Sequence, residues 1–192
     1  ACDVAGFHLP LEGVNNVLKS RYQRHLRPRV HKVIRFITRR QGLIVKAGNP
    51  LNIQGLEDLI RPDVKFINRQ DHSGTRALLD ELLLRRDMKP SQISGYEDME
   101  FTHSAVAAFV AAGMADVGMG VEAAASQFNL DFIPLTSERY LFVCHHKAIH
   151  SEGVQQFLRI IRSEPFLDAI NTLSGYEPDQ SGEICSVKDL FE

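Results

Sequence analysis

The fold is decided by the stretch Val64-Lys65-Phe66-Ile67-Asn68-Arg69-Gln70-Asp71-His72-Ser73-Gly74-Thr75-Arg76. Residues 64–67 are rich in β-formers and predict a strand. Residues 68–73 are polar and predict a turn, and the spacing of leucines after Gly74 predicts a helix. The apolar stripe of this helix consists of Leu78, Leu79, Leu82 and Leu83. A strand, a short turn and a helix in this order are typical of α/β proteins.

The rest of the chain repeats this alternation. Thr102 is a capping residue for a second helix, which Gly113 ends. A strand from residue 116 is expected to pass into a tight glycine turn at Gly118 and Gly120. Further strands are predicted at 43–45, 93–96, 131–135 and 140–144, and further helices at 54–59, 123–128, 153–161 and 165–173, with Phe166, Ile170 and Leu173 facing inward. The pattern predicts an α/β fold with a largely parallel sheet and a loose polar tail after Gly175.

Composition restricts the class of protein. The chain has 192 residues, a formal net charge of −2 and 44% hydrophobic residues, which fits one large domain or two small lobes. No run approaches the roughly 20 apolar residues that span a bilayer, so we expect no membrane contact. The three cysteines form no Cys-x-x-Cys pair, which favours a cytoplasmic protein over a zinc or disulfide protein. Ala1-Cys2-Asp3-Val4-Ala5-Gly6 is interpreted as the end of a strand, so we expect that an upstream part is missing.

The start of the helix at Gly74 is the best candidate for a ligand-binding site. The first amides of a helix have no partners within it, and the aligned dipoles leave about half a positive charge there. Glycine lets a ligand approach the backbone, and Ser73 and Thr75 add hydroxyl groups. Arg76 could supply charge or brace the loop, with Asn68 and Arg69 positioning it. The structural alternative is that Ser73 is only a helix cap beside a solvated arginine.

A second helix start follows Thr102 and His103. In a parallel sheet, strand carboxyl ends and helix amino ends lie at the same edge, so this start and the glycine turn at Gly118 could face the same cleft. His103 alone is as compatible with a structural or solvated role as with ligand binding.

A series of short motifs then identifies a resemblance. They are, in order, Ala5-Gly6-Phe7-His8, Arg40-Gln41-Gly42-Leu43-Ile44-Val45, Gly48-Asn49-Pro50, Asn68-Arg69-Gln70, Ser73-Gly74-Thr75-Arg76, Leu79-Asp80, Gly95-Tyr96-Glu97, Thr102-His103, Ala105-Val106-Ala107, Ala115-Asp116-Val117-Gly118-Met119-Gly120 and Glu138-Arg139-Tyr140. Together they resemble the periplasmic-binding-protein-like domain of some bacterial and archaeal regulators and molybdopterin biosynthesis proteins. That domain is similar to the type II binding proteins for molybdate and tungstate.

The resemblance implies an N-terminally truncated, two-lobed type II fold. Lobe 1 would comprise residues 1–46 and 139–192, without its first strand and helix, and lobe 2 would comprise 47–138. The ligand would lie between the lobes. The implied ligand-binding residues are Gly6, Phe7, His8, Asn68, Arg69, Ser73, Gly74, Thr75, Arg76, Thr102, His103, Gly118 and Tyr140. The sequence departs from the family at His72, which replaces a glycine, and at Asp71, which could repel an anion.

The implied function is binding of a small oxyanion such as molybdate or tungstate, or of a molybdopterin-related phosphate. The domain would belong to a transcriptional regulator or a molybdenum cofactor protein, with an upstream helix-turn-helix or molybdopterin biosynthesis domain as its partner. We expect no enzymatic activity, no metal and no other cofactor, and a homodimer that covers the edge strand. The alternative is an enzyme or an enzyme-associated domain of molybdopterin biosynthesis, because some transferases share the fold.

Three other readings have weaker support. His8, His103 and Ser73 could be imagined as an acyl-transfer set, but there is no Gly-x-Ser-x-Gly elbow. Ten Lys and Arg and no acidic residue stand between Lys19 and Lys46, which suggests nucleic acid but is better explained by a solvated helical face. Cys144, His145, His146 and His150 are close in sequence, but neighbouring histidines on a strand point to opposite faces and would not share a metal.

Overall fold

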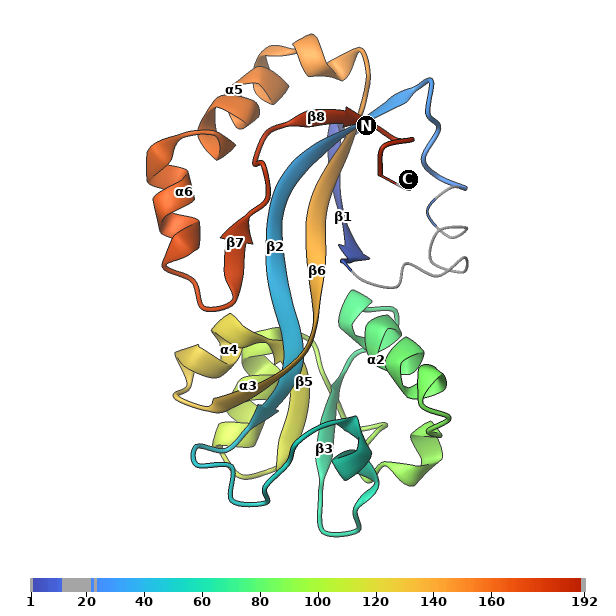
Figure 1. Cartoon of the computed structure of the whole chain (residues 1–192), viewed down its shortest axis with the longest axis vertical. Coiled ribbons are helices and arrows are strands. Elements are labelled where there is room, and N and C mark those ends of the chain that lie inside the picture. The colour runs from blue at the N-terminus through green and yellow to red at the C-terminus, as the bar shows by residue number, and fades with distance from the viewer. Residues whose placement is uncertain (1, 12–21, 23, 191–192) are drawn as a thin grey trace. The chain divides into compact units, whose positions relative to one another are not determined.

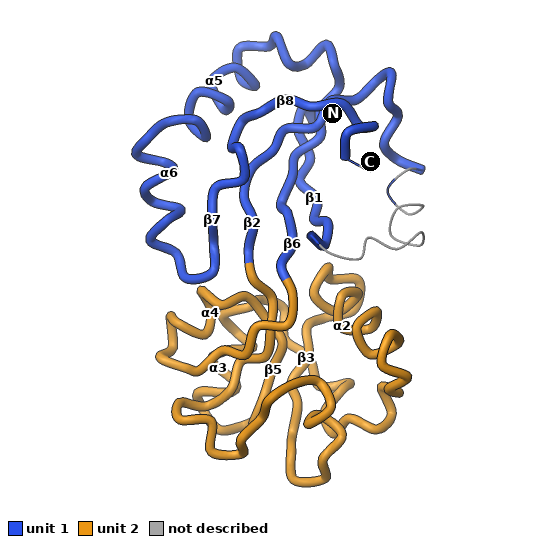
Figure 2. Tube along the Cα trace, viewed as in Figure 1, with its two compact units in different colours: residues 1–39, 137–192 blue, residues 40–136 orange. Residues whose placement is uncertain are grey.

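The computed structural model describes residues 2–11, 22 and 24–190. The chain divides into two compact units (Figure 2). Unit 1 comprises residues 1–39 and 137–192, and unit 2 comprises residues 40–136. Two long strands, β2 (His31–Val45) and β6 (Asp131–His145), contribute residues to both units.

Unit 2 is a sheet with helices on both faces (Figure 1). Its strand order is β2-β5-β3-β4, where β3 is Phe66–Arg69, β4 is Met99–Glu100 and β5 is Val117–Val121. The helices are α2 (Gly74–Arg85), α3 (His103–Ala111) and α4 (Glu122–Gln127), with 3-10 turns at Leu56–Ile60 and Pro90–Gln92. Phe66 packs in the core beneath α2, whereas Ile67, the next residue of β3, packs with α3. The alternation of side chains along β3 therefore supplies both cores.

Unit 1 is built around β6 and β2. The strand β1 (Val4–Pro10) pairs antiparallel with β6, with Val4 opposite Cys144 and Pro10 opposite Glu138. Two short strands, β7 (Tyr176–Pro178) and β8 (Ile184–Ser186), pair antiparallel with β2. The helices α5 (Glu152–Ile161) and α6 (Glu164–Asn171) follow a 3-10 turn at Ala148–His150.

The α/β fold predicted from the alternation is confirmed, but the predicted direction of pairing is wrong. Among the described residues, β3 pairs in parallel with β4 and with β5. The pairs β1–β6, β2–β5, β2–β7 and β2–β8 are antiparallel. Strand–helix alternation predicts parallel pairing only when each helix crosses back over the sheet, and β2 and β6 are not connected in that way.

Several predicted elements are also corrected. The strands expected at 43–45, 131–135 and 140–144 are parts of the longer β2 and β6, and residues 31–40 of the basic run lie on a strand rather than a helical face. The rest of that run falls partly outside the described residues. Gly118 and Gly120 lie inside β5 rather than in a turn, and residues 94–97 form a turn instead of a strand. The Ala1–Gly6 stretch holds the beginning of a strand, at Val4, rather than its end.

The tail and the second carboxyl-terminal helix also differ from expectation. The tail after Gly175 is ordered as β7 and β8, and Val187 is buried in a core with Val33 and Leu141. Leu173 lies beyond the end of α6 and is 43% exposed rather than inward-facing. These short segments pair with the long neighbouring strand β2, and local composition does not reveal that pairing.

Candidate functional site

The start of α2 is formed by a tight connection from β3. His72 adopts a positive φ of 66°, a conformation in which the family's usual glycine would be unstrained. Ser73 is the N-cap, and its hydroxyl oxygen accepts a hydrogen bond from the amide of Arg76 at 3.1 Å. The capping role considered as the structural alternative for Ser73 is therefore present.

Two backbone donors at this helix start have no hydrogen-bond partner in the part of the chain that the structure describes. Within the described residues, the amides of Gly74 and Thr75 donate to no acceptor, while the Arg76 amide is held by Ser73. Gly74 is exposed, and a Cβ added to it would meet no atom within 4 Å. The helix start therefore presents free amides next to open space, the arrangement that binds an anion.

The hydroxyl of Thr75 is already used. Thr75 is 3% exposed, and its Oγ1 lies 3.2 Å from Nε2 and 3.3 Å from Oε1 of Gln41 on β2. Its side chain anchors α2 to the sheet, so Thr75 can offer its amide but not its hydroxyl to a ligand.

The polar residues around the loop hold it in place. Arg76 is 8% exposed, donates to the carbonyl of Tyr96 at 3.1 Å and lies 3.9 Å from the centre of the Tyr96 ring. Asn68 donates to the same carbonyl at 3.0 Å. Arg69 donates to Gln70 and, at 3.1 Å, to the carbonyl of Phe101. Of the two roles open to Arg76, the structure favours bracing of the loop.

The second helix start lies beside the first. β3 and β4 are parallel neighbours, α2 follows β3, and α3 follows β4, so both helices begin at the same edge of the sheet. The hydrogen bond from Arg69 to Phe101 joins the two connections. Thr102 caps α3 by accepting from the amide of Ala105 at 3.0 Å.

The glycines of β5 allow α3 to pack closely against the sheet. A Cβ on Gly118 would lie 2.4 Å from Val106, and one on Gly120 would lie 3.3 Å from Nδ1 of His103. Gly118 is buried in β5, where the lack of a side chain allows α3 to pack closely. His103 is half-buried with its Nδ1 covered, next to Gly120.

The remaining predicted site residues lie in unit 1. Tyr140 stands opposite His8, with ring centres 4.3 Å apart, and it covers Gly6, where a Cβ would lie 2.6 Å from the tyrosine hydroxyl. Phe7 packs with Tyr22 in a core cluster, away from the face that carries His8. Gly6 and Phe7 therefore have packing roles, and His8 and Tyr140 share one face.

His8 belongs to a charged cluster that the sequence analysis missed. Glu138 is 4% exposed and accepts a hydrogen bond from Arg39 Nε at 2.5 Å. Its Oε1 also lies 3.5 Å from Nδ1 of His8. Burial lowers the pKa of His8 below its ordinary value of 6.5, the carboxylate of Glu138 opposes this shift, and Arg39 adds to it.

We expect His8 to make the protein less stable in mild acid. Because its pKa is lowered in the folded state, His8 stabilises the fold fully above the unfolded value of 6.5, and this contribution is lost as the pH falls through the folded-state pKa. The difference in free energy of unfolding between wild type and His8→Gln should therefore change below pH 6.5 and be constant above it. Urea unfolding across that range tests this, and a difference that stays constant throughout would refute it. His31, whose pKa is also lowered, titrates in both proteins and cancels.

Two missed residues, Gln41 and Glu138, are buried polar groups that contact residues far along the chain. Both fall inside motifs of the family resemblance, but only their position in the sheet reveals their partners. A third missed residue is Tyr96, whose backbone carbonyl accepts hydrogen bonds from the side chains of Asn68 and Arg76.

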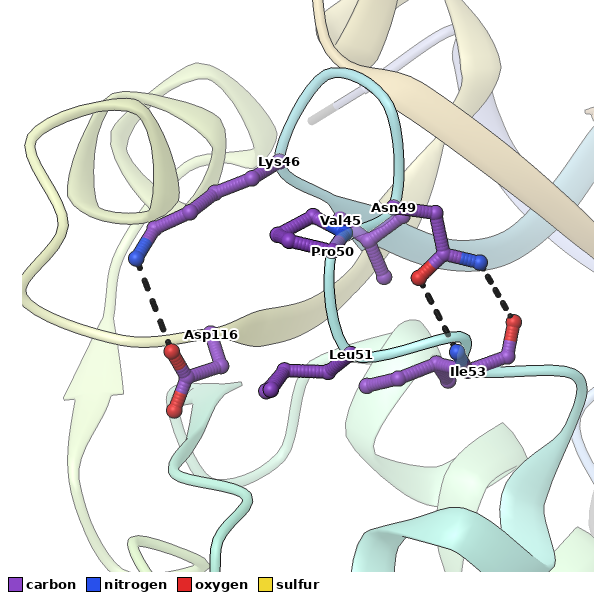
Figure 3. A pocket seen from close by; sticks show the side chains of 7 residues that line it. All are labelled: Val45, Lys46, Asn49, Pro50, Leu51, Ile53 and Asp116. Atoms are coloured by element: carbon purple, nitrogen blue, oxygen red, sulfur yellow. Dashed lines mark hydrogen bonds and ion pairs between the residues drawn. The ribbon is translucent and has the colours of Figure 1, made fainter.

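A small pocket lies elsewhere in unit 2 (Figure 3). Its polar groups are paired: Asn49 exchanges two hydrogen bonds with the backbone of Ile53, at 2.8 and 2.9 Å, and Lys46 lies 3.5 Å from Asp116. These pairs fix the turn at residues 46–53.

The described part of the chain contains no group of three or more His, Cys, Asp and Glu side chains placed to hold a metal ion. The rings of His145 and His146 are stacked 4.6 Å apart, so the expectation that they point to opposite faces is wrong: β6 ends at His145, and His146 is no longer on the strand. No helix among the described residues is long and apolar enough to cross a membrane.

The described part of the chain therefore forms two α/β units, one of which presents backbone amides without a protein partner at the start of α2. Residues 1–162 match the PBP superfamily domain, and the chain belongs to this superfamily of ligand-binding domains. The chain is 36% identical over 183 residues to the uncharacterized protein YvgK of Bacillus subtilis, covering 95% of this chain and 59% of the relative. It is 37% identical over 108 residues to an uncharacterized protein of Clostridium pasteurianum encoded in the 5′ region of a ferredoxin 2Fe-2S gene, covering 56% of this chain and 96% of the relative.

Solved structures show the same fold at low sequence identity. A phosphate-bound protein of Clostridium perfringens, named as a phosphate ABC transporter substrate-binding protein, is 14% identical with a TM-score of 0.62, over 92% of this chain and 79% of that one. A Clostridium difficile domain named as the substrate-binding domain of a molybdenum ABC transporter is 17% identical with a TM-score of 0.54, over 92% of this chain and 76% of that one. The effector binding domain of QuiR in complex with shikimate is 16% identical with a TM-score of 0.56, over 83% of this chain and 69% of that one.

Proposed function

We propose that the chain binds a small oxyanion, or the phosphate group of a molybdopterin-related compound, at the start of α2. The observation that carries the proposal is the pair of free amides at Gly74 and Thr75 beside open space. The second helix start, held to the first by the hydrogen bond from Arg69 to Phe101, adds a second positive dipole end at the same sheet edge. Similarity to domains named for phosphate and molybdenum transport agrees with this chemistry.

The proposed ligand is held by neutral donors. The guanidinium of Arg76 is paired with Asp80 at 3.6 Å and Glu97 at 3.8 Å, so its charge is balanced within unit 2. Amides in a fixed orientation recognise the geometry of a tetrahedral anion without a mobile cation. In the cell, we propose that the domain serves a cytoplasmic transcriptional regulator or molybdenum cofactor protein and reports or delivers the bound anion.

A calorimetric titration tests the proposal directly. The full-length protein is titrated separately with molybdate, tungstate, sulfate, phosphate and a pterin phosphate. We expect at least one of them to bind with a dissociation constant below about 0.1 mM, which corresponds to more than about 5 kcal/mol of binding free energy. Heats indistinguishable from dilution for all five compounds would overturn the proposal. Binding of the pterin phosphate alone would assign the site to the cofactor rather than to the free anion.

Ser73→Ala is expected to have a modest effect on both stability and binding. Removing an N-cap hydroxyl costs about 1 kcal/mol of stability. The affinity should fall by a similar amount, roughly fivefold, because the amides of Gly74 and Thr75 survive. Thermal unfolding and titration with the anion that wild type binds best measure the two effects. A loss of a hundredfold or more would show that the hydroxyl, rather than the amides, provides the main contact.

A further inference from the structure

We propose that Tyr96 is a positioning residue for the anion site, which fixes the first turn of α2 through Asn68, Arg76 and Asp80. This inference rests on the proposed function, since it concerns the same helix start. Tyr96 follows a 3-10 turn and lies far from the loop in sequence. Nevertheless, three separate parts of this residue, its carbonyl, its ring and its hydroxyl, contact the end of β3 or the first turns of α2.

The carbonyl of Tyr96 joins the strand to the helix. It accepts from Nδ2 of Asn68, in β3, at 3.0 Å and from Nη1 of Arg76, in the first turn of α2, at 3.1 Å. All three residues are buried, so water does not compete for these bonds. The two ends of the connection that carries Gly74 and Thr75 are thereby held at a single oxygen atom.

The preceding glycine makes this contact feasible. Gly95 has a positive φ of 83°, and a Cβ there would lie 2.1 Å from the carbonyl oxygen of Phe66. Only glycine combines this conformation with such close approach to β3. The turn at residues 94–97 therefore packs directly against β3, which brings the Tyr96 carbonyl within hydrogen-bond distance of Asn68.

The side chain of Tyr96 makes two further contacts with α2. The guanidinium of Arg76 lies 3.9 Å from the ring centre, a cation–π contact, and the hydroxyl donates to Oδ1 of Asp80, one turn further along the helix. Burial and the neighbouring Asp80 raise the pKa of Tyr96 to about 12, so the hydroxyl remains a donor at neutral pH. Asp80 in turn lies 3.6 Å from Arg76. The arginine is therefore fixed from three sides, and the backbone of the first turn is fixed with it.

The test removes the hydroxyl alone. Tyr96→Phe retains the ring and the carbonyl but loses the bond to Asp80. We expect the affinity for molybdate to fall about two- to tenfold, because the hydroxyl acts on the site only through Asp80 and Arg76 and the amides of Gly74 and Thr75 remain. Amide hydrogen exchange gives a readout that requires no ligand: the protected amides of Arg76 and Ala77, which bond to Ser73, should exchange faster relative to those of Leu82 and Leu83 in the same helix. A general loss of stability would accelerate all four alike.

Two further variants control the interpretation. Arg86→Gln removes an ion pair with Glu57 at 3.0 Å and a hydrogen bond to the carbonyl of Leu82 at the far end of α2, and should leave the exchange of Arg76 and Ala77 unchanged. Asp80→Asn keeps an acceptor for the tyrosine hydroxyl and should preserve more affinity than Asp80→Leu. If Tyr96→Phe and Arg86→Gln accelerate the first turn equally, or neither does, Tyr96 has no positioning role. If wild type fails to bind molybdate while Tyr96→Phe shows the expected exchange pattern, the result counts against the ligand assignment and not against the positioning role.

Discussion

Gly74→Asp is expected to abolish anion binding, with at least about a hundredfold loss of affinity, while unit 2 remains folded. The new carboxylate would stand at the first position of α2, next to the free amides of Gly74 and Thr75. It would repel an incoming anion and compete for the same donors, and removing a charge-assisted contact costs about 1.5–3 kcal/mol even before repulsion is added. The fold tolerates the change because nothing lies within 4 Å of the added Cβ and an acidic residue is favourable at a helix start.

Gly74→Asn is the matched control, since asparagine has nearly the same size and no charge. Its loss of affinity should be distinctly smaller than that of Gly74→Asp, and both variants should unfold within a few degrees of wild type. Titration with the best-binding oxyanion and thermal unfolding measure these effects. Wild-type affinity in Gly74→Asp would reduce the helix start to an ordinary cap and remove the proposed function with it.

Glu138→Leu is expected to cause the largest loss of stability, about 3–5 kcal/mol, because it leaves the charge of Arg39 without its partner in a buried position. The side chains of Arg39 and Glu138 are only 13% and 5% exposed, and the 2.5 Å hydrogen bond between them joins β2 to β6 in unit 1. The substitution also removes the carboxylate that raises the pKa of His8, so the pKa of His8 should fall further below its ordinary value. Denaturant unfolding and NMR titration of His8 measure the two effects.

The double variant Arg39→Met with Glu138→Leu separates a lone buried charge from lost packing. Replacing both partners of a buried ion pair by apolar side chains is often neutral, so this variant should recover most of the lost stability. Glu138→Gln, which keeps an acceptor for Arg39, should lie between Glu138→Leu and wild type. If the double variant is as unstable as Glu138→Leu, the pair matters through its shape and not through its charge.

The start of α2 could be predicted because its determinants are local. Ser73 and Thr102 form their capping bonds three residues along the chain, and the stripe of leucines in α2 depends only on helical spacing. Such contacts join residues that are close in the sequence, so they can be predicted without knowledge of the rest of the fold. Local sequence was not sufficient to predict whether the side chains of Thr75, Arg76 and Arg69 are available to a ligand. They form hydrogen bonds with residues that lie 20 to 34 positions away in the sequence, namely Gln41, Tyr96 and Phe101 respectively.

The strands were predicted less well, for a related reason. The basic segment at residues 31–40 carries the charge of a solvated surface, yet it forms a strand because β7 and β8 pair with it. Those two strands have only three residues each, and their position is set by pairing with β2 and by the packing of Ile184 and Cys185 against the core. The glycines of β5 resemble turn residues in sequence but occupy a strand, because α3 packs where their side chains would stand.

The sequence alone was sufficient to predict the alternation of an α/β fold and the residue at which α2 begins. These properties follow from periodicity, capping and glycine, whose energetics act over a few residues. Three features required knowledge of the whole fold: the antiparallel pairing of the long strands, the Arg39–Glu138 pair across 99 residues, and the contacts that hold Arg76 against Tyr96. A polar side chain carries the same donors wherever it lies, and only burial next to a particular partner decides whether they are already used.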